Sequence, residues 1–239
     1  MKLDSIMPGH PHDTKSPRPL ISLSSPGTGP GPIRLDIENL HCRFGETLVV
    51  QDVSLHADPG EHVAVIGGNG SGKTTLLRSV MGLHREWTGR ILLNRQAMGP
   101  RPATAHPGLA WMPQRQPRGQ FPFTVRELLS SSGNEQTSLD AARDLGIPAL
   151  LHRPLTALSG GQLQRAYLAR VMGALAAGAG LLLADEPTAA LDFEGQEQVA
   201  DLMANMPVTL LVVTHDLAMA RKCHRVLQMA QGRMREVRL

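Results

Sequence analysis

The chain has 239 residues, enough for one domain or two closely joined subdomains with a sizeable buried core. Its formal net charge of +3 is too small to argue for a nucleic-acid partner, and it fits a protein beside an anionic membrane face equally well. The two cysteines, Cys42 and Cys223, lack the spacing of metal ligands and indicate a reducing compartment.

The first 32 residues differ from the rest in composition, because half of them are Pro, Gly or Ser and no helical or strand period is present. We predict a disordered tail over 1–32, since this segment cannot bury enough apolar surface to offset its ordering entropy. His10 and His12 could bind a metal, but two flexible imidazoles make a weak site, so an inert tail is favoured. No charged-then-apolar leader is present, and a secretory signal is not expected.

Ordered structure is expected from Ile33 onward. Ile33, Leu35 and Ile37 alternate with charged residues, which is typical of a half-buried strand. A second strand is expected over 48–55, and the turn at 58–61 leads into a third over 62–66. The early strands predict an antiparallel side sheet.

A glycine-rich loop follows the third strand and precedes a helix expected over 73–82. Its glycines let backbone N–H groups approach phosphate oxygens, and the helix start adds unpaired N–H groups. Lys73 can then reach the β and γ phosphates of a nucleotide, and the Thr74 hydroxyl can ligate Mg²⁺. The alternative is a glycine-rich turn that matches by accident, which the flanking strand and helix disfavour. The residues that fit the phosphate-binding loop pattern are Gly67, Gly68, Asn69, Gly70, Ser71, Gly72, Lys73 and Thr74.

Strands and helices alternate through the rest of the chain, which predicts an α/β domain with a mainly parallel core sheet. The longest uncharged run, 171–184, contains three glycines and is too short to span a bilayer, so it fits a helix end that leads into a buried strand. We therefore expect a protein that is soluble by itself. Further strands are expected over 90–93, 109–112, 181–184, 208–213 and 225–229, and further helices over 124–131, 138–145, 160–176, 193–205 and 216–222.

Two carboxylates, Asp185 and Glu186, end the apolar strand over 181–184. They should lie at the carboxyl edge of the sheet, where open α/β sheets bind ligands. Asp185 would hold Mg²⁺ through its water shell, and Glu186 would accept a proton from an attacking water. The alternative is an acidic pair that caps the following helix, which a phosphate-binding loop in the same chain disfavours.

The run Leu158-Ser159-Gly160-Gly161-Gln162 opens the helix over 160–176 with a Ser N-cap and two glycines, and it forms another anion site. In this run the chain resembles the ATP-binding cassette (ABC) ATPases, because Leu-Ser-Gly-Gly-Gln is the signature sequence of that family. The resemblance covers 33 to about 238. In that family Ser159, Gly160, Gly161 and Gln162 would grip the γ-phosphate bound to a second subunit, so two cassettes enclose two ATP molecules.

The other landmarks of the family are present in order. The resemblance implies that Phe44 stacks on adenine, that Gln114 senses Mg²⁺ and the attacking water, and that Thr75 joins the nucleotide contacts. It also implies that Asp192 crosses the dimer interface and that His215 contacts the γ-phosphate. Each has another interpretation: Phe44 as a core residue, His215 as a helix cap and Gln114 as a solvated loop residue.

The segment 115–157 is shorter than in typical family members, where it receives the membrane partner. A short helix is expected around Arg126, Glu127 and Leu128, followed by a polar loop over 130–138. Two roles for the large apolar residues here stay open: anchors for the partner, or filling of a small helical core. These residues are Phe121, Phe123 and Leu128.

The resemblance implies a P-loop ABC cassette over 33–239, with a helical subdomain at about 115–175 inserted in a RecA-like core. It implies an ATPase that uses ATP and Mg²⁺, forms a homodimer on ATP binding and energises integral membrane permease subunits. A separate substrate-binding protein is expected, and no nucleic acid. The protein would be cytoplasmic and peripheral at the inner face of the cell membrane.

The segments 111–114 and 121–125 look like those of zinc/manganese uptake cassettes, so metal-ion import is the favoured transport role. Siderophore-type cassettes share part of this pattern and remain the alternative. Two other classes are disfavoured. Soluble ABC proteins of translation or DNA repair usually carry two cassettes or a long coiled-coil insert, and a non-hydrolysing adaptor would not need both Glu186 and His215.

Overall fold

A computed structural model of the chain describes residues 31–98, 108–114 and 123–239. Phe121, His10 and His12 lie outside the described residues. The strands are β1 (Leu35–Phe44), β2 (Thr47–Ala57), β3 (His62–Ile66), β4 (Trp87–Leu93), β5 (Gln96–Ala97), β6 (Leu109–Met112), β7 (Leu181–Asp185), β8 (Thr209–Thr214), β9 (Arg225–Ala230) and β10 (Arg233–Val237). The helices are α1 (Lys73–Val80), α2 (Val125–Ser130), α3 (Glu135–Asp144), α4 (Gly160–Ala176), α5 (Phe193–Ala204) and α6 (Leu217–Arg221), with short 3-10 turns η2 (Pro148–Leu150) and η3 (Leu155–Ala157).

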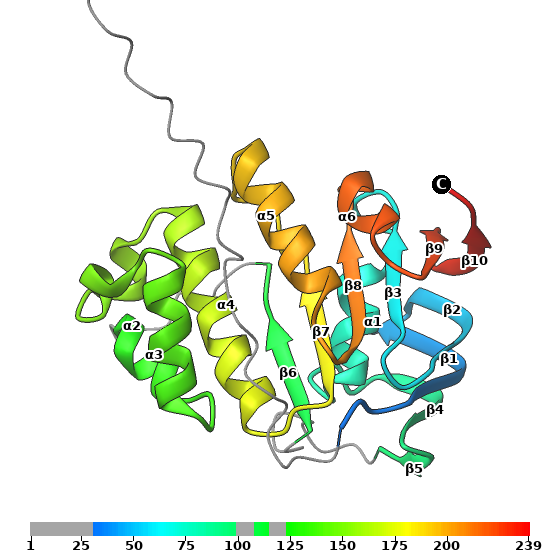
Figure 1. Ribbon diagram of the computed structural model, residues 1–239. Coiled ribbons are helices and arrows are strands. Elements are labelled where there is room, and N and C mark those ends of the chain that lie inside the picture. Colours follow the sequence, from blue (N-terminus) through cyan, green and yellow to red (C-terminus); the bar gives the residue numbers. More distant parts are fainter. Residues whose placement is uncertain (1–30, 99–107, 115–122) are drawn as a thin grey trace, which may run out of the picture.

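The core sheet has the strand order β10-β9-β3-β8-β7-β6 in the described part of the chain. Neighbouring strands from β9 to β6 are parallel, and β10 pairs antiparallel at the edge. Every residue of β3, β7 and β8 is buried, as expected for parallel strands covered on both faces. The parallel arrangement brings the carboxyl ends of β3, β6, β7 and β8 to one edge (Figure 1).

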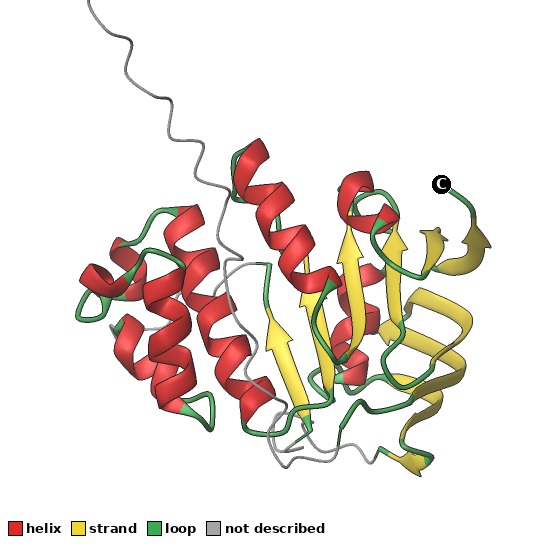
Figure 2. Cartoon of the chain, viewed as in Figure 1, coloured by secondary structure: helices red, strands yellow, loops and turns green. Residues whose placement is uncertain are grey.

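A second sheet, with the order β2-β1-β4-β5, is antiparallel throughout. It is the side sheet that the early alternating residues predict. The predicted α/β fold with a mainly parallel core sheet is therefore confirmed, and Figure 2 shows the strands of both sheets beside the helices.

The strands β5 and β10 were not predicted. The first is only two residues long, and the second has three charged residues, two of them consecutive, and no buried side chain. Neither gives the sustained apolar alternation on which strand prediction depends.

The helices α2, α3 and α4 pack together on one side of the core sheet (Figure 1). The prediction of a polar loop over 130–138 is wrong in its second half, because α3 begins at Glu135. The Asn134 side chain caps this helix by accepting a hydrogen bond from the Thr137 N–H at 3.1 Å, and Ser138 is fully buried. Short polar residues at a cap resemble a loop in sequence, since they serve both roles.

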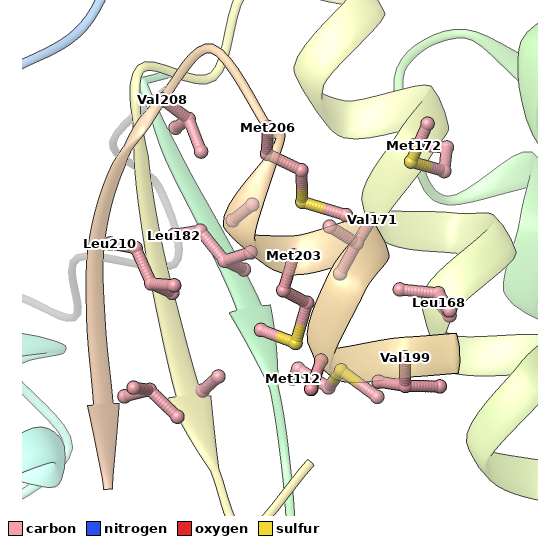
Figure 3. Packing of buried hydrophobic residues seen from close by; sticks show 14 of the residues in the cluster. Met112, Leu168, Val171, Met172, Leu182, Val199, Met203, Met206, Val208 and Leu210 are labelled. Carbon is pink, nitrogen blue, oxygen red and sulfur yellow. The ribbon is translucent and has the colours of Figure 1, made fainter. Parts of the chain in front are cut away.

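The core sheet separates two hydrophobic clusters. Leu181 and Leu183 of β7 face the side sheet and α1, whereas Leu182 and Ala184 face α4 and α5. This alternation follows from the period of two in a strand. Figure 3 shows the second cluster at close range, with side chains from α4 and α5 packed against the sheet. Its labelled residues are Met112, Leu168, Val171, Met172, Leu182, Val199, Met203, Met206, Val208 and Leu210.

None of the helices within the described ranges is both long enough and apolar enough to cross a membrane.

Candidate functional site

The glycine-rich loop lies between the carboxyl end of β3 and the start of α1 at Lys73, as predicted. Two of its glycines are required by geometry. A Cβ on Gly67 would lie 2.2 Å from the Met229 carbonyl oxygen, and Gly72 has a φ of 105° at the N-cap of α1. The loop is therefore held against the β9–β10 turn, where the Gly232 N–H donates to the Ser71 carbonyl at 3.1 Å.

Lys73 is buried, with 7% of its surface exposed, and its ammonium group lies over the loop. Its Nζ donates to the carbonyl oxygens of Gly67 at 2.7 Å and Gly68 at 2.9 Å. An ammonium group carries three donors on a flexible stem, so these bonds can be exchanged for bonds to anionic oxygens of a ligand. The loop and Lys73 thus form a positively charged cradle at the sheet edge.

Asp185 ends β7 beside this cradle. Thr74 Oγ1 donates to Asp185 Oδ1 at 3.5 Å, and Asp185 is only 3% exposed. Burial raises the pKa of the Asp185 carboxyl, an effect that the hydrogen bond from Thr74 opposes. A hydroxyl and a carboxylate this close supply the hard oxygen ligands that Mg²⁺ prefers, so these two residues fit that ion.

Glu186 is buried and paired with His215, which follows β8. Glu186 Oε2 lies 2.7 Å from His215 Nδ1 and also accepts a hydrogen bond from the His215 backbone N–H at 3.2 Å. The Glu186 backbone N–H donates to the Val213 carbonyl at 2.8 Å. The Glu186 carboxylate is thus fixed by side-chain and backbone contacts at the carboxyl edge of the sheet, where it can accept a proton.

The geometry excludes three of the alternative interpretations. The helix after Asp185 and Glu186 is capped by Asp192, which accepts a hydrogen bond from the Gly195 N–H at 2.9 Å, so the acidic pair is not its cap. The cap of α6 is Asp216 rather than His215. Phe44 is 51% exposed and is not a core residue; one side of its ring contacts His84, with ring centroids 4.6 Å apart.

The signature run forms the start of α4, as predicted. Ser159 Oγ accepts a hydrogen bond from the Gln162 N–H at 3.3 Å, and the Gln162 side chain accepts one from the Ser159 N–H at 3.0 Å. This reciprocal capping box orders the helix start. A Cβ on Gly160 would lie 3.0 Å from Cβ of Ala190, so the run packs against the segment before Asp192.

Lys73, Thr74, Asp185, Glu186 and His215 meet at one sheet edge. Gln114 is exposed just beyond β6, whose last residue pairs with Ala184 of β7, so it lies at the same edge without a hydrogen bond to this group. The other residues named from the sequence, Phe44, Ser159–Gln162 and Asp192, also have no hydrogen bond to this group.

Gln164 was not predicted from the sequence as a residue of this site. It is a buried amide on α4 that donates to the carbonyl oxygens of Glu186, at 3.4 Å, and Pro187. The sequence did contain a signal that this residue is buried, because Gln164 is a polar residue on the same helix face as the apolar Leu168 and Val171.

Residues 50–189 match the family model described as ABC transporter. The chain belongs to this family. The predicted ABC-type ATPase and its cassette fold are thereby confirmed. The chain is the ATP-binding part of such a transporter.

Among curated relatives, the Hemin import ATP-binding protein HmuV of Rhodopseudomonas palustris (strain ATCC BAA-98 / CGA009) is 37% identical over 205 residues, which cover 80% of this chain and 76% of that protein. The Zinc import ATP-binding protein ZnuC of Jannaschia sp. (strain CCS1) is 34% identical over 192 residues, 77% of this chain and 73% of that protein. The Petrobactin import ATP-binding protein FpuD of Bacillus anthracis is 33% identical over 204 residues, 78% of this chain and 73% of that protein.

Solved structures show the same fold. The dimeric structure of MJ0796, a bacterial ABC transporter cassette, superposes with a TM-score of 0.73 and 24% sequence identity, covering 86% of this chain and 99% of that chain.

Proposed function

We propose that the cluster at the carboxyl edge of the core sheet binds Mg²⁺-ATP and hydrolyses it. One observation carries the proposal: Glu186 and His215, whose side chains are 2.7 Å apart, directly follow β7 and β8, and β8 lies beside β3, the strand that leads into the loop over which Lys73 is buried. A fixed carboxylate beside a phosphate cradle is what attack of water on a phosphate requires. In this proposal the nucleotide contacts are Phe44, Gly67, Gly68, Asn69, Gly70, Ser71, Gly72, Lys73, Thr74 and Thr75.

Each residue of the cluster has a role in the proposed reaction. Lys73 leaves the loop carbonyls and pairs with β and γ phosphate oxygens. Thr74, Asp185 and Gln114 hold Mg²⁺, which when bound supplies positive charge beside the phosphates. Glu186 orients the attacking water in line with the γ-phosphate and accepts its proton, and His215 stabilises the developing charge.

A second copy would complete the site. The start of α4 has the features of an anion site, namely a Ser N-cap followed by two glycines at the N-terminus of a helix. Ser159–Gln162 makes no hydrogen bond to the loop at Gly67–Gly72 or to the Lys73–His215 group among the described residues. We infer that Ser159–Gln162 closes on the γ-phosphate held by a second copy, with Asp192 at the interface.

The proposed dimer can be tested by measuring the molecular mass of the protein in solution. Wild-type protein should release phosphate from ATP, and Glu186→Gln should form a dimer with Mg²⁺-ATP but not with ADP. Light scattering and size-exclusion chromatography measure the dimer fraction. Identical monomer fractions with and without ATP would contradict the dimer, and failure of the wild type to hydrolyse ATP would contradict the catalytic role.

We further propose that the cassette drives import of a metal-containing substrate through a separate permease, with a substrate-binding protein delivering the cargo. It would sit at the cytoplasmic face of the membrane, bound to that permease, and the domain would comprise 33–239 with its helical subdomain at about 115–175. The similarity to HmuV and FpuD favours an iron chelate such as hemin or a siderophore. Import of zinc or manganese, the first prediction from sequence, is the second candidate and is supported by the similarity to ZnuC.

Uptake assays in cells that lack this protein would distinguish the two candidate cargoes. Uptake of radiolabelled hemin, a ferric siderophore and Zn²⁺ would be compared in the deletion strain, complemented either with wild type or with Glu186→Gln. Loss of iron-chelate uptake alone supports the first candidate, loss of Zn²⁺ uptake alone supports the second, and unchanged uptake of all three contradicts both.

A further inference from the structure

The backbone at Glu186 has an unusual conformation for a buried residue. Its φ is 51°, in the left-handed region that disfavours any residue with a Cβ. In the described part of the chain the other non-glycine residues with positive φ are all exposed, whereas Glu186 is 6% exposed. Such a conformation persists only where surrounding contacts hold it, so the contacts around Glu186 determine where its carboxylate lies.

Contacts from two sides hold this residue. On one side, the Glu186 N–H donates to the Val213 carbonyl, and its carboxylate accepts from His215. On the other side, its carbonyl oxygen accepts from the Ala189 N–H at 3.3 Å and from Gln164 Nε2 at 3.4 Å. Gln164 Nε2 also donates to the Pro187 carbonyl, so one amide group holds two successive peptide units.

Through these hydrogen bonds, Gln164 connects α4 to the peptide of Glu186. It lies on α4, five residues after Ser159, and is 7% exposed. The start of this helix is the segment that we infer to contact the nucleotide of a second copy. A movement of α4 toward or away from that nucleotide therefore acts directly on the Glu186 peptide of its own chain.

We propose that Gln164 is a positioning residue for Glu186 and makes the orientation of this carboxylate depend on the position of α4. The inference rests on the proposed function and adds a link between the two nucleotide sites of the dimer. Gln164 does not touch substrate; it acts through the peptide that carries the general base. A purely structural role, filling the space between α4 and the loop after β7, is the alternative that the experiment must separate.

Two substitutions test the role. Gln164→Met keeps the length of the side chain but removes both donors. Gln164→Glu keeps the shape, and its carboxylate has no donor when ionised but regains an O–H donor when protonated. The matched control is Gln196→Met, since the partly buried Gln196 amide also donates to a backbone carbonyl, that of Leu191 at 3.1 Å, without contacting Glu186.

The steady-state ATPase activity of the full chain would be measured from pH 6 to pH 8, together with ATP affinity and melting temperature. Gln164→Met should lower kcat by about tenfold or more, because a small misplacement of a reacting group has a cost of this order. Its KM for ATP and its ATP affinity should stay within about twofold of wild type. Gln164→Glu should be equally slow at pH 8 and should recover relative to wild type toward pH 6. Gln196→Met should behave as wild type.

A wild-type kcat in Gln164→Met overturns the inference while leaving the proposed ATPase intact. So does a parallel loss of kcat, ATP affinity and melting temperature, which would indicate packing alone. If Gln164→Met does not fold, the pH profile of Gln164→Glu decides, because a ratio to wild type that does not change with pH contradicts the need for a donor. If the wild type itself does not hydrolyse ATP, both the function and the inference fail.

Discussion

Glu186 Oε2 accepts two hydrogen bonds from a single residue, His215, one from Nδ1 at 2.7 Å and one from the backbone N–H at 3.2 Å. The contact with the carboxylate makes Nδ1 the protonated nitrogen of the ring, which leaves Nε2 for a ligand. The imidazole is 69% exposed, whereas the carboxylate is 7% exposed. The pair thus places an exposed imidazole against a buried carboxylate.

Replacing Glu186 with Gln should separate binding from hydrolysis. The amide keeps the shape of the side chain but cannot accept a proton from water, so turnover should fall by about a hundredfold or more while ATP affinity remains. Phosphate release and calorimetric titration with ATP measure the two effects. Near-normal phosphate release by this variant would show that another group is the base.

Lys73→Ala should weaken ATP binding. The substitution removes the ammonium group that lies 2.7 Å and 2.9 Å from the loop carbonyls, and with it the charge that would pair with phosphate oxygens. Affinity for ATP is measured by calorimetry. Lys222→Ala is the control, since Lys222 pairs with Asp201 at the surface, away from the loop. Equal affinities in the two variants would contradict the assignment.

Asp185→Asn should make the ligand-free protein more stable and less active. Burial raises the pKa of the Asp185 carboxyl, so its ionised form destabilises the folded state at neutral pH, above the unfolded-state pKa. The neutral amide removes this effect and should raise the free energy of unfolding in urea at pH 7, while Mg²⁺-dependent ATP binding weakens. A variant less stable than wild type would contradict the argument.

The sequence predicts where these residues lie, because each residue type has a local cause. The loop needs glycine at Gly67 and Gly72, and the carboxylates must follow a buried strand. Consequently, their meeting at one sheet edge follows from strand order alone. Element type was also predictable where apolar periodicity was strong, as in β3, β6 and α4.

What could not be predicted depends on contacts between distant segments. The two hydrogen bonds from Gln164 join residues more than twenty positions apart, and a local pattern shows only that a polar residue lies on a buried helix face. The left-handed φ of Glu186 has no sequence signal, since such a position usually carries glycine. The start of α3 at Glu135 was missed because polar residues there serve as cap, as Asn134 does, and as core, as Ser138 does.

A buried histidine should make stability depend on pH. His62 is 3% exposed, and its Nε2 contacts the carbonyl oxygens of Met206 at 3.2 Å and Val208 at 3.0 Å. Its Nδ1 has no hydrogen-bond partner among the described residues. Burial, together with the neighbouring His224, lowers the pKa of His62 from 6.5. The unfolded chain therefore takes up the proton first as pH falls, and stability decreases below about pH 6.5 by at most about 1.4 kcal/mol per pH unit.

Urea unfolding of wild type and His62→Gln at pH 8 and pH 5.5 tests this effect. Gln keeps a donor near the two carbonyls, so the variant should lose only about 1 kcal/mol at pH 8. The difference between the two proteins should shrink or reverse at pH 5.5, since only wild type carries the buried imidazole. A difference that is equal at both pH values would mean that His62 does not contribute to the acid sensitivity.

Phe123 lies just before α2, where the sequence left two roles open. Phe123 is 58% exposed, so it does not fill the helical core, whereas Leu128 packs against the buried cluster. An exposed aromatic residue is a candidate anchor for a protein partner, because such residues dominate interface energetics. We expect Phe123→Ala to keep the ATPase activity of the isolated chain and its melting temperature, and to lower transport when the chain is assembled with its permease.

Leu129→Ala, on α2, is the control. Leu129 is fully buried, so its truncation should leave a cavity that costs about 2–5 kcal/mol and lowers the melting temperature by several degrees. Transport would be measured in vesicles that contain the assembled complex, with both variants compared at a temperature below the melting point of Leu129→Ala. Reduced transport by Phe123→Ala at an unchanged melting temperature supports an anchor. Normal transport by that variant would eliminate Phe123 as a contact with the permease, since an exposed side chain that can be removed without loss contributes to neither folding nor docking.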